Sequence, residues 1–459
     1  MLETTPTEDA TTPAIATTEP GGATASPRYV AGRYHARVET LLADGLARGP
    51  VVAVIEPPDV ALLAVVVGPG RAFDPPSEFT FIGGLPGEIV EVEARWNLPR
   101  PGRKRGKRVP EPQVRLLNAI APAPDRAKPE CPVFGECGGC QLQHIHYTAQ
   151  LVWKRERVTA ALRDAGFSAP PVEPTVGSAA QYGYRNHMRF SVNWDGRPGF
   201  TARGSHRVLP MTSCPLAHPR INEALAALAA DPLPRPQVVI RHGVATGQTL
   251  IQPSPNHETR ARLEGAGLDV RDETIEEEMS GARFRIRLSS FFQTNTAQAN
   301  RMVALALDRL PAGPDVTLVD AYCGVGVFAR LLAERAGTVL AIEESASAIR
   351  DARWNLRQST NVEIIQAKVE DVLPGMTRTL DGLVIDPPRA GCQRAVLDAL
   401  IARRVPRVVY ISCNPDTLAR DLAALCLRSE AYTLVSAQPL DMFPQTAHIE
   451  TIVVLEARA

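Results

Sequence analysis

The stretch LVDAYCGVGVFARLLAE, residues 318–334, joins an apolar run that ends in an acid to a glycine-containing turn and then to an apolar helical pattern. The run ends at Asp320, the turn contains Gly324 and Gly326, and a helix is expected to begin near Val327. Glycines at such a turn allow the backbone to approach a ligand closely. The stretch therefore predicts a strand, a ligand-binding turn and a helix, in that order.

Apolar runs separated by helix-length segments surround this stretch and continue towards the end of the chain. Strands that alternate with helices are typical of a doubly wound α/β domain with a mostly parallel sheet. We therefore assign residues 291–459 to an α/β domain, which begins with a helix over 300–310. The expected strands are 316–320, 339–343, 383–386, 408–412 and 449–455.

The acid that closes the next strand indicates what the turn binds. Glu343, in AIEES, lies 23 residues after Asp320, close to the spacing at which a carboxylate contacts ribose hydroxyls. A dinucleotide is one candidate ligand, but the turn lacks the G-x-G-x-x-G spacing of dinucleotide sites. An adenosine-type cofactor without a pyrophosphate, such as S-adenosylmethionine, fits better.

Two other strands are expected to end in chemically useful residues. VIDPPRAG, residues 384–391, places Asp386 at a strand end, and VVYISCNPDTLARD, residues 408–421, does the same for Cys413. In this fold class ligands bind at the shared carboxyl edge of the parallel strands. Asp-Pro-Pro is also ordinary turn chemistry, and a free Cys is usually a small core residue. Cys413, at a strand-to-turn junction with polar neighbours, is nevertheless a candidate nucleophile.

The last strand brings two candidate bases. In DMFPQTAHIETIVVLE, residues 441–456, Glu450 falls at the start of the strand. His448 lies two positions earlier and therefore on the same face of an extended chain. Either side chain could serve as a general base.

A cluster of cysteines indicates a metal site. CPVFGECGGC contains Cys131, Cys137 and Cys140, and Cys214 follows 74 residues later in TSCPLAH. Three thiols within ten residues, with glycines that let the backbone curl, are a strong metal-site pattern. A Cys₄ shell suits zinc or an iron–sulfur cluster, and the spacing does not choose between them. Reduced cysteines that bind no metal are the alternative.

The N-terminal part divides into three expected regions. Residues 1–27 are rich in Thr, Pro, Ala and Gly and predict a disordered acidic tail. Short β-branched runs broken by Gly and Pro predict a small β-barrel over 28–125. A central domain over 126–290 would hold the cysteines and a helix over 147–165. The expected barrel strands include 51–55, 62–67, 79–82 and 89–94.

Charge is balanced overall but unevenly distributed. The 459 residues contain 50 Lys and Arg against 50 Asp and Glu. Residues 1–27 carry four acids and no base, and 291–459 carry 17 bases and 19 acids, so 28–290 holds 33 bases and 27 acids. The loop RPGRKRGKR, residues 100–108, suits phosphates, although a solvated charge run is an equal alternative. The mildly basic middle of the chain leaves nucleic acid open as a partner.

Composition excludes several classes of protein. No apolar run reaches the roughly 18 residues that span a bilayer, so an integral membrane protein is not expected. Eight cysteines are too few for a disulfide-built secreted scaffold of this length. The N-terminus has no secretory pattern, and we expect a cytoplasmic monomer without membrane association.

Taken together, the cysteine quartet, SCNPDTLARD and FPQTAHIE resemble the bacterial RNA uracil-5-methyltransferases. The similarity is to the iron–sulfur, TRAM-domain group that makes 5-methyluridine in 23S ribosomal RNA, and it runs from about residue 33 to 459. It implies a class I (Rossmann-like) methyltransferase domain, a TRAM/OB-like β-barrel and a central iron–sulfur cluster domain. It also implies two cofactors, S-adenosylmethionine and a 4Fe-4S cluster.

The resemblance also implies roles for particular residues. The family nucleophile falls on Cys413 and the family base on Glu450. The chain departs from relatives at two positions. Relatives carry Asn where this chain has Val327, and often Asn or a carboxylate where it has Lys368. The implied cofactor contacts are Gln293, from an F-x-Q-x-N segment, Tyr322, Glu343 and Asp386. The implied cluster ligands are Cys131, Cys137, Cys140 and Cys214.

The implied chemistry needs one thiol and one base. Carbon C5 of uracil attacks a methyl sulfonium only after a thiolate has added at C6, and a base then removes the C5 proton so that the thiol leaves. The target base must be unstacked or single-stranded for a side chain to reach it.

Rival functions differ in what they require of the chain. Methyltransferases acting on exocyclic nitrogens need neither Cys413 nor Glu450. A non-catalytic RNA-binding iron–sulfur protein would need neither the glycine turn nor Asp386. Among RNA substrates, 23S ribosomal RNA is favoured and transfer RNA is the alternative.

Overall fold

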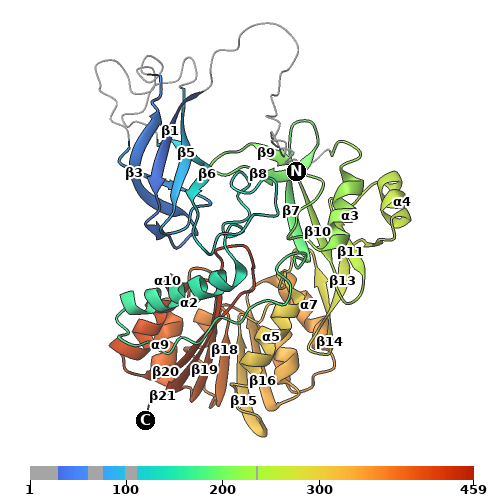
Figure 1. Cartoon of the computed structure of the whole chain (residues 1–459). Coiled ribbons are helices and arrows are strands. Elements are labelled where there is room, and N and C mark those ends of the chain that lie inside the picture. Colours follow the sequence, from blue (N-terminus) through green and yellow to red (C-terminus); the bar gives the residue numbers. More distant parts are fainter. Residues whose placement is uncertain (1–28, 60–75, 99–110, 234–235, 459) are drawn as a thin grey trace, which may run out of the picture.

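The computed structural model describes residues 29–59, 76–98, 111–233 and 236–458 (Figure 1). The expected tail 1–27, the expected strand 62–67 and the basic loop 100–108 lie outside these residues. The described chain contains three sheets, of six, six and seven strands, and a two-stranded hairpin. No helix within the described ranges is long and apolar enough to cross a membrane.

The N-terminal sheet is antiparallel and has its own core. Its order is β2-β3-β1-β5-β6, with β4 paired to β3. Alternate residues of β1 and β5 are buried, and Tyr34 and Trp96 are the largest of them. The expected strands 51–55 and 89–94 are confirmed within the longer strands β3 and β5, and the expected strand 79–82 corresponds to β4, which begins and ends one residue earlier. The strands are β1 (Tyr29–Arg37), β2 (Thr40–Leu41), β3 (Ala47–Glu56), β4 (Glu78–Phe81), β5 (Ile89–Asn97) and β6 (Gln113–Ala121).

The central sheet has six strands in the order β12-β11-β10-β7-β8-β9. One of its faces packs with helices α3 (Pro219–Leu228) and α4 (His257–Gly265) into a single apolar core. The hairpin of β13 (Thr274–Met279) and β14 (Ala282–Arg287) follows. The six strands are β7 (His187–Val192), β8 (Pro198–Thr201), β9 (Val208–Pro210), β10 (Gln237–His242), β11 (Gln248–Gln252) and β12 (Asp269–Arg271).

The C-terminal sheet is mostly parallel, as expected, and has the order β17-β16-β15-β18-β19-β21-β20. All five expected strands are confirmed, and β17 and β20 are additional. Strands β20 and β21 are antiparallel to each other, and β21 is antiparallel to β19. The strands are β15 (Gly313–Ala321), β16 (Ala336–Glu343), β17 (Val362–Gln366), β18 (Gly382–Ile385), β19 (Arg407–Ser412), β20 (Tyr432–Leu440) and β21 (Glu450–Ala457).

The central strands of this sheet are buried on both faces, because helices cover each face. The expected helix 300–310 is α5, which begins earlier because the Asn295 side chain accepts a hydrogen bond from the Gln298 N–H and caps it. The helices are α5 (Thr296–Leu307), α6 (Val327–Leu332), α7 (Ala346–Asn355), α8 (Val369–Val372), α9 (Arg394–Arg403), α10 (Pro415–Leu422) and the π-helix η1 (Ala423–Arg428).

The carboxyl edge of the parallel strands faces the other two sheets. Figure 1 places the C-terminal end of β21 at the lower edge of the sheet. Because β21 runs antiparallel to β19, the parallel strands end at the opposite, upper edge. Strand order reverses between β15 and β18, and ligands bind in this fold where that reversal occurs.

Helix α2 (Tyr147–Asp164) confirms the helix expected over 147–165, and it packs on the C-terminal sheet. Val158 and Leu162 are fully buried in the same core as β18 and β19. The chain that follows runs beside β20, where Val172 pairs with Ala437 in a parallel bridge. This segment covers β20, the edge strand of the sheet, and so prevents β20 from pairing with a strand of another chain.

Lys154 of α2 is fully buried and reaches the segment between β20 and β21. Its Nζ donates hydrogen bonds to Asp441 Oδ1 at 2.6 Å, to the His448 carbonyl at 2.9 Å and to the Phe443 carbonyl at 3.2 Å. The side chains of Lys154 and Asp441 are both 0% exposed. A buried ion pair of this kind is costly to break, because the remaining charge keeps its desolvation penalty.

We predict that Lys154→Met lowers the free energy of unfolding of the C-terminal region by about 3–5 kcal/mol, because Asp441 is left buried without its cation. The double variant Lys154→Met with Asp441→Leu should recover most of that loss. Urea denaturation followed by circular dichroism measures both effects. Arg163→Met, an exposed position on the same helix, is the control. A single Lys154 variant as stable as the control would contradict the prediction.

Candidate active site

Three of the residues predicted from sequence meet at the carboxyl edge. Asp386 directly follows β18, Cys413 directly follows β19, and Glu450 is the first residue of β21. Ser412 pairs with Thr451 across β19 and β21, so Cys413 and Glu450 leave that pair in the same direction. The Glu450 and Asp386 carboxyl groups both act on the Cys413 thiol electrostatically. The candidate nucleophile and two acids therefore share one site.

The glycine turn follows β15 and has a left-handed backbone. Tyr322, Gly324 and Gly326 have φ angles of +64°, +55° and +86°. At Gly326 a Cβ atom would also lie only 3.1 Å from Leu356, so glycine suits both the backbone and the packing there. The Gly324 N–H donates to Glu343 Oε2 at 3.1 Å, which holds that carboxylate against the turn. The structure thus places the Glu343 carboxylate against the turn that contains Tyr322.

Asp320, at the end of β15, was used in the sequence only to mark a strand end, but it belongs to this site. Its carboxylate accepts a hydrogen bond from the Ala329 N–H of α6 at 2.7 Å. Burial raises the pKa of Asp320 to about 7, and the charges of Asp386 and Glu343 contribute. Burial alone raises the pKa of Asp386 to about 7. These acids favour a ligand that carries positive charge.

Gln293 lies in the segment that joins the central region to α5. Its carbonyl accepts a hydrogen bond from Asn186 Nδ2 at 3.2 Å. The same segment is tied to the active-site side by Asn295, whose Nδ2 donates to the Met442 carbonyl at 3.1 Å. The F-x-Q-x-N segment therefore contacts both the central region and the chain that leads to Glu450.

The surroundings of Cys413 and Glu450 raise the pKa of both side chains. Burial raises the pKa of the half-buried Cys413 thiol to about 11, and the nearby Glu450 and Asp386 charges add to it. Glu450 is only 6% exposed, and burial followed by the Asp386 charge holds its pKa well above the usual value. The local structure alone does not activate the thiol.

Arg389 is the cation that acts on both groups, and sequence reasoning missed it. It lowers the pKa of Cys413 and that of Glu450 through space. Its carbonyl accepts hydrogen bonds from Asn414 Nδ2 at 3.2 Å and Thr417 Oγ1 at 3.1 Å, which joins its loop to the one after Cys413. The only signal in the sequence was its place in VIDPPRAG, three residues after Asp386.

His448, the other candidate base, is neutral. Burial lowers its pKa to about 4, and the cations Arg389, Arg185 and Lys154 contribute. Its ring packs edge-on against Phe443, with 5.8 Å between ring centroids. An imidazole with so low a pKa is a weak proton acceptor, which favours Glu450 as the base.

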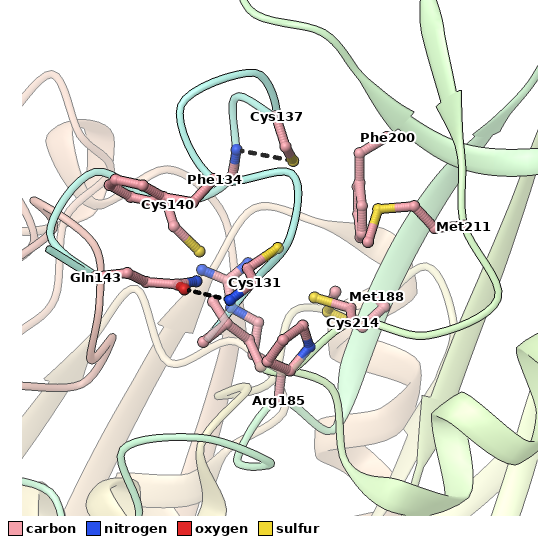
Figure 2. A pocket seen from close by; sticks show the side chains of 13 residues that line it. Cys131, Phe134, Cys137, Cys140, Gln143, Arg185, Met188, Phe200, Met211 and Cys214 are labelled. Carbon is pink, nitrogen blue, oxygen red and sulfur yellow. Dashed lines mark hydrogen bonds between the residues drawn. The ribbon is translucent and has the colours of Figure 1, made fainter. Parts of the chain in front are cut away.

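The four predicted cysteine ligands line one pocket, which Figure 2 shows with their sulfurs facing a common space. All four are free thiols. Burial raises the pKa of each, to about 12 for Cys140. The apolar walls come from Phe134, Met188, Phe200 and Met211. The structure therefore brings the loop after the N-terminal sheet, which holds Cys131, Cys137 and Cys140, close to the loop before α3, which holds Cys214.

The arrangement of these thiols does not match a single ion. Among the described residues, no group of three or more His, Cys, Asp or Glu side chains is placed to hold a metal ion. Zinc would need all four sulfurs at about 2.3 Å from one point.

The Cys131 N–H donates to Gln143 Oε1 at 3.0 Å, and the Cys214 N–H donates to Asn222 Oδ1 at 2.8 Å. Both cysteine loops are thus fixed by side chains outside the quartet.

Comparison with known proteins identifies the family. The family profile described as tRNA (Uracil-5-)-methyltransferase matches residues 259–458. An uncharacterized RNA methyltransferase of Gloeobacter violaceus is 34% identical over 90% of this chain and 97% of its own length. Another, of Thermosynechococcus vestitus, is 36% identical over 74% of this chain and 87% of its own. The chain belongs to this RNA methyltransferase family.

A solved structure shows the same fold. It is the crystal structure of Pyrococcus abyssi tRNA (uracil-54, C5)-methyltransferase in complex with S-adenosyl-L-homocysteine. The TM-score is 0.66 at 23% sequence identity, with 92% of this chain and 99% of that chain covered. The C-terminal region of this methyltransferase therefore has the α/β methyltransferase fold. The protein is an S-adenosylmethionine-dependent RNA methyltransferase.

We predict that alkylation of Cys413 by iodoacetamide accelerates about tenfold per pH unit from pH 7 to pH 10, because only the thiolate reacts and its pKa lies above this range. Arg389→Gln should slow the reaction several-fold at each pH, since a cation that lowers the thiol pKa is lost. Peptide mass spectrometry measures the rate. Arg394→Gln, whose side chain is 85% exposed on α9, is the matched control. A rate that levels off below pH 9 would contradict the prediction.

Proposed function

We propose that this enzyme transfers the methyl group of S-adenosylmethionine to C5 of a uridine in RNA, through a covalent adduct between Cys413 and C6. The observation that supports this most is the shared position of a thiol and a deeply buried carboxyl group. Cys413 and Glu450 stand beside each other at the strand edge that also carries the glycine turn. A methyltransferase that acts on a nucleophilic nitrogen has no use for either group.

The reaction begins at the Cys413 thiol. The thiol gives its proton to water, and the thiolate sulfur bonds to C6, which moves the C5–C6 π electron pair towards C5 and O4. Arg389 favours the thiolate, because a nearby cation lowers the pKa of the thiol. S-Adenosylmethionine, when bound, supplies the methyl group that C5 takes. Glu450 as carboxylate then accepts the C5 proton. The C5–H electron pair re-forms the C5–C6 double bond, and sulfur leaves C6 with the C6–S pair as a thiolate.

The buried position of Glu450 suits it for the last proton transfer. A carboxylate in an apolar setting has a raised pKa and is a stronger proton acceptor than an exposed one. Its place at the start of β21 is fixed by pairing on both sides, to β19 and to β20. The base is therefore both strong and rigidly held.

Four residues are proposed to hold the cofactor. The Glu343 carboxylate, which lies against the glycine turn, would accept the ribose hydroxyls. Asp386 would face the positively charged end of the cofactor, where a cation lowers its raised pKa. Tyr322 in the turn and Gln293 before α5 complete the proposed set.

We also propose that the cysteine quartet binds a 4Fe-4S cluster and that the N-terminal sheet is a TRAM/OB-like barrel that contacts RNA. The proposal of a cluster is supported by the four free sulfurs that line one pocket. Such a cluster takes one thiolate from each Cys. Its ligands would be Cys131, Cys137, Cys140 and Cys214.

The proposed substrate is 23S ribosomal RNA, with transfer RNA as the second candidate. The cysteine quartet and the N-terminal sheet favour ribosomal RNA, through the resemblance to the iron–sulfur group of uracil-5-methyltransferases. The transfer RNA alternative is supported by the description of the matching family profile, which names tRNA.

We predict that Glu450→Gln accumulates a covalent protein–RNA adduct, because elimination cannot proceed without the base. Cys413→Ala should form neither adduct nor 5-methyluridine while it retains cofactor binding, measured by calorimetry. Denaturing gels with 23S ribosomal RNA fragments and with tRNA transcripts detect the adduct and identify the substrate class. Substantial methylation by Cys413→Ala would overturn the nucleophile assignment. Loss of activity in Glu450→Gln without any adduct would overturn the base assignment.

We predict that anaerobic purification yields about four iron and four sulfide per chain. Cys140→Ala should lose most of both, while Cys426→Ala, a buried cysteine of the C-terminal core, should retain them. Metal analysis and sulfide determination measure the content. A protein that contains one zinc and no sulfide would contradict the cluster assignment.

A further inference from the structure

A second pocket, of about 510 Å³, opens on the central sheet away from its helices. Arg189 of β7, Val239 of β10 and Gln252 of β11 pair in register and form one row of it. The alternate residues of these strands, among them Phe190 and Ile240, point into the core that α3 and α4 share. The pocket is therefore on the face of the sheet that those helices leave uncovered. Its remaining lining residues are Pro236, Gln237, Pro253, Ser254, Leu288 and Ser289.

The lining of this pocket combines five polar side chains with apolar surface. It holds one guanidinium, from Arg189, and two amides, from Gln237 and Gln252, and no acid. Hydroxyls come from Ser254 and Ser289. Within the part of the chain that the structure describes, none of these five side chains has a hydrogen-bond or ion-pair partner. Valine, leucine and proline side chains supply flat apolar surface between them. Charge, hydrogen-bonding edges and apolar surface are what a nucleotide requires of its site.

The pocket is connected to the proposed active site by one short segment. Leu288 and Ser289 line the pocket, and Gln293 follows four residues later. The neighbouring Ser290 Oγ donates to Asp351 of α7 at 2.7 Å, and the Arg287 N–H donates to the same carboxylate at 2.9 Å. The segment is thus anchored on the methyltransferase domain while it forms a wall of the pocket.

Size and charge fit one nucleotide of an RNA chain. Pockets for small ligands measure about 300–1,000 Å³, and this one lies within that range. Arginine binds phosphate oxygens in a fixed planar geometry, and glutamine amides pair with the edges of bases. Single-stranded RNA presents unstacked bases to such groups. A cationic or purely apolar ligand would leave Arg189 unmatched.

We propose that this pocket binds a nucleotide that flanks the target uridine, with Arg189 at its phosphate and Gln237 and Gln252 at its base. This inference rests on the proposed function, because it assumes that RNA reaches the carboxyl edge of the C-terminal sheet. The pocket would then fix the register of the RNA and contribute to the choice of the uridine that is methylated.

The test uses the full-length protein and two variants of the pocket, Arg189→Gln and the double variant Gln237→Ala with Gln252→Ala. The binding probe is a fluorescein-labelled single-stranded 12-nucleotide RNA of mixed sequence, titrated at several salt concentrations. The methylation substrate is ribosomal RNA from a strain that lacks the gene. Arg394→Gln is the matched control for loss of one exposed arginine. Cofactor affinity by calorimetry shows whether each variant is folded.

We expect Arg189→Gln to raise the Kd and the KM for RNA about 5- to 20-fold and to reduce the dependence on salt by about one phosphate contact, with kcat and cofactor affinity unchanged. The amide variant should raise the KM with the salt dependence unchanged, because its groups contact a base. Competition by uridine monophosphate that is as strong as competition by RNA would mean that the pocket takes free nucleotides, and would overturn the proposal.

Other outcomes separate the two proposals. Pocket variants that match Arg394→Gln in Kd and KM would overturn the inference while 5-methyluridine formation by the wild type still supports the proposed function. If the wild type methylates no RNA, the proposed function fails, and the binding titrations alone decide whether the pocket takes RNA.

Discussion

The buried ammonium group of Lys154 is the interaction on which the active-site geometry depends. It gathers Asp441 and two backbone carbonyls of the connection between β20 and β21, a segment without regular secondary structure. A charge in an apolar interior tolerates few alternative arrangements of its partners, since each lost hydrogen bond is expensive. The start of β21, and with it Glu450, is placed by a contact that begins on a helix far away in the sequence.

The same connection is tied to the cysteine loop. The backbone N–H groups of Gln141 and Leu142 donate to the Gln445 carbonyl at 3.1 and 3.0 Å. The Gln150 amide donates to the Gln445 side chain at 3.0 Å. Because Gln141 directly follows Cys140, the position of the quartet and the position of Glu450 share one hydrogen-bond network. Hydrogen bonds therefore connect the cysteine pocket to the segment that leads to Glu450.

The sequence predicted most of the C-terminal fold, because each central strand is an unbroken apolar run that ends in a recognisable turn. It also placed Asp386 and Cys413 at one edge, since parallel strands share their carboxyl ends. Glu450 joins them because β21 runs antiparallel to β19, which the sequence pattern did not show. Strand β1 was missed because its buried and exposed residues alternate and form no apolar run. Asp320 and Arg389 were missed because their importance lies in charges acting through space. The packing of α2 on the C-terminal sheet could not be read from its helical pattern either.

The charges around Cys413 determine how readily its thiol forms a thiolate. Burial raises the pKa of the thiol, the charges of Glu450 and Asp386 raise it further, and Arg389 opposes them only in part. Any further cation beside Asp386 lowers the pKa of the thiol and of both acids, so a positively charged ligand favours thiolate formation. When that positive charge is lost, the pKa of Glu450 rises again and its carboxylate takes up a proton more readily. In the proposed reaction, this order of charges matches the order of steps, with nucleophile formation before proton acceptance.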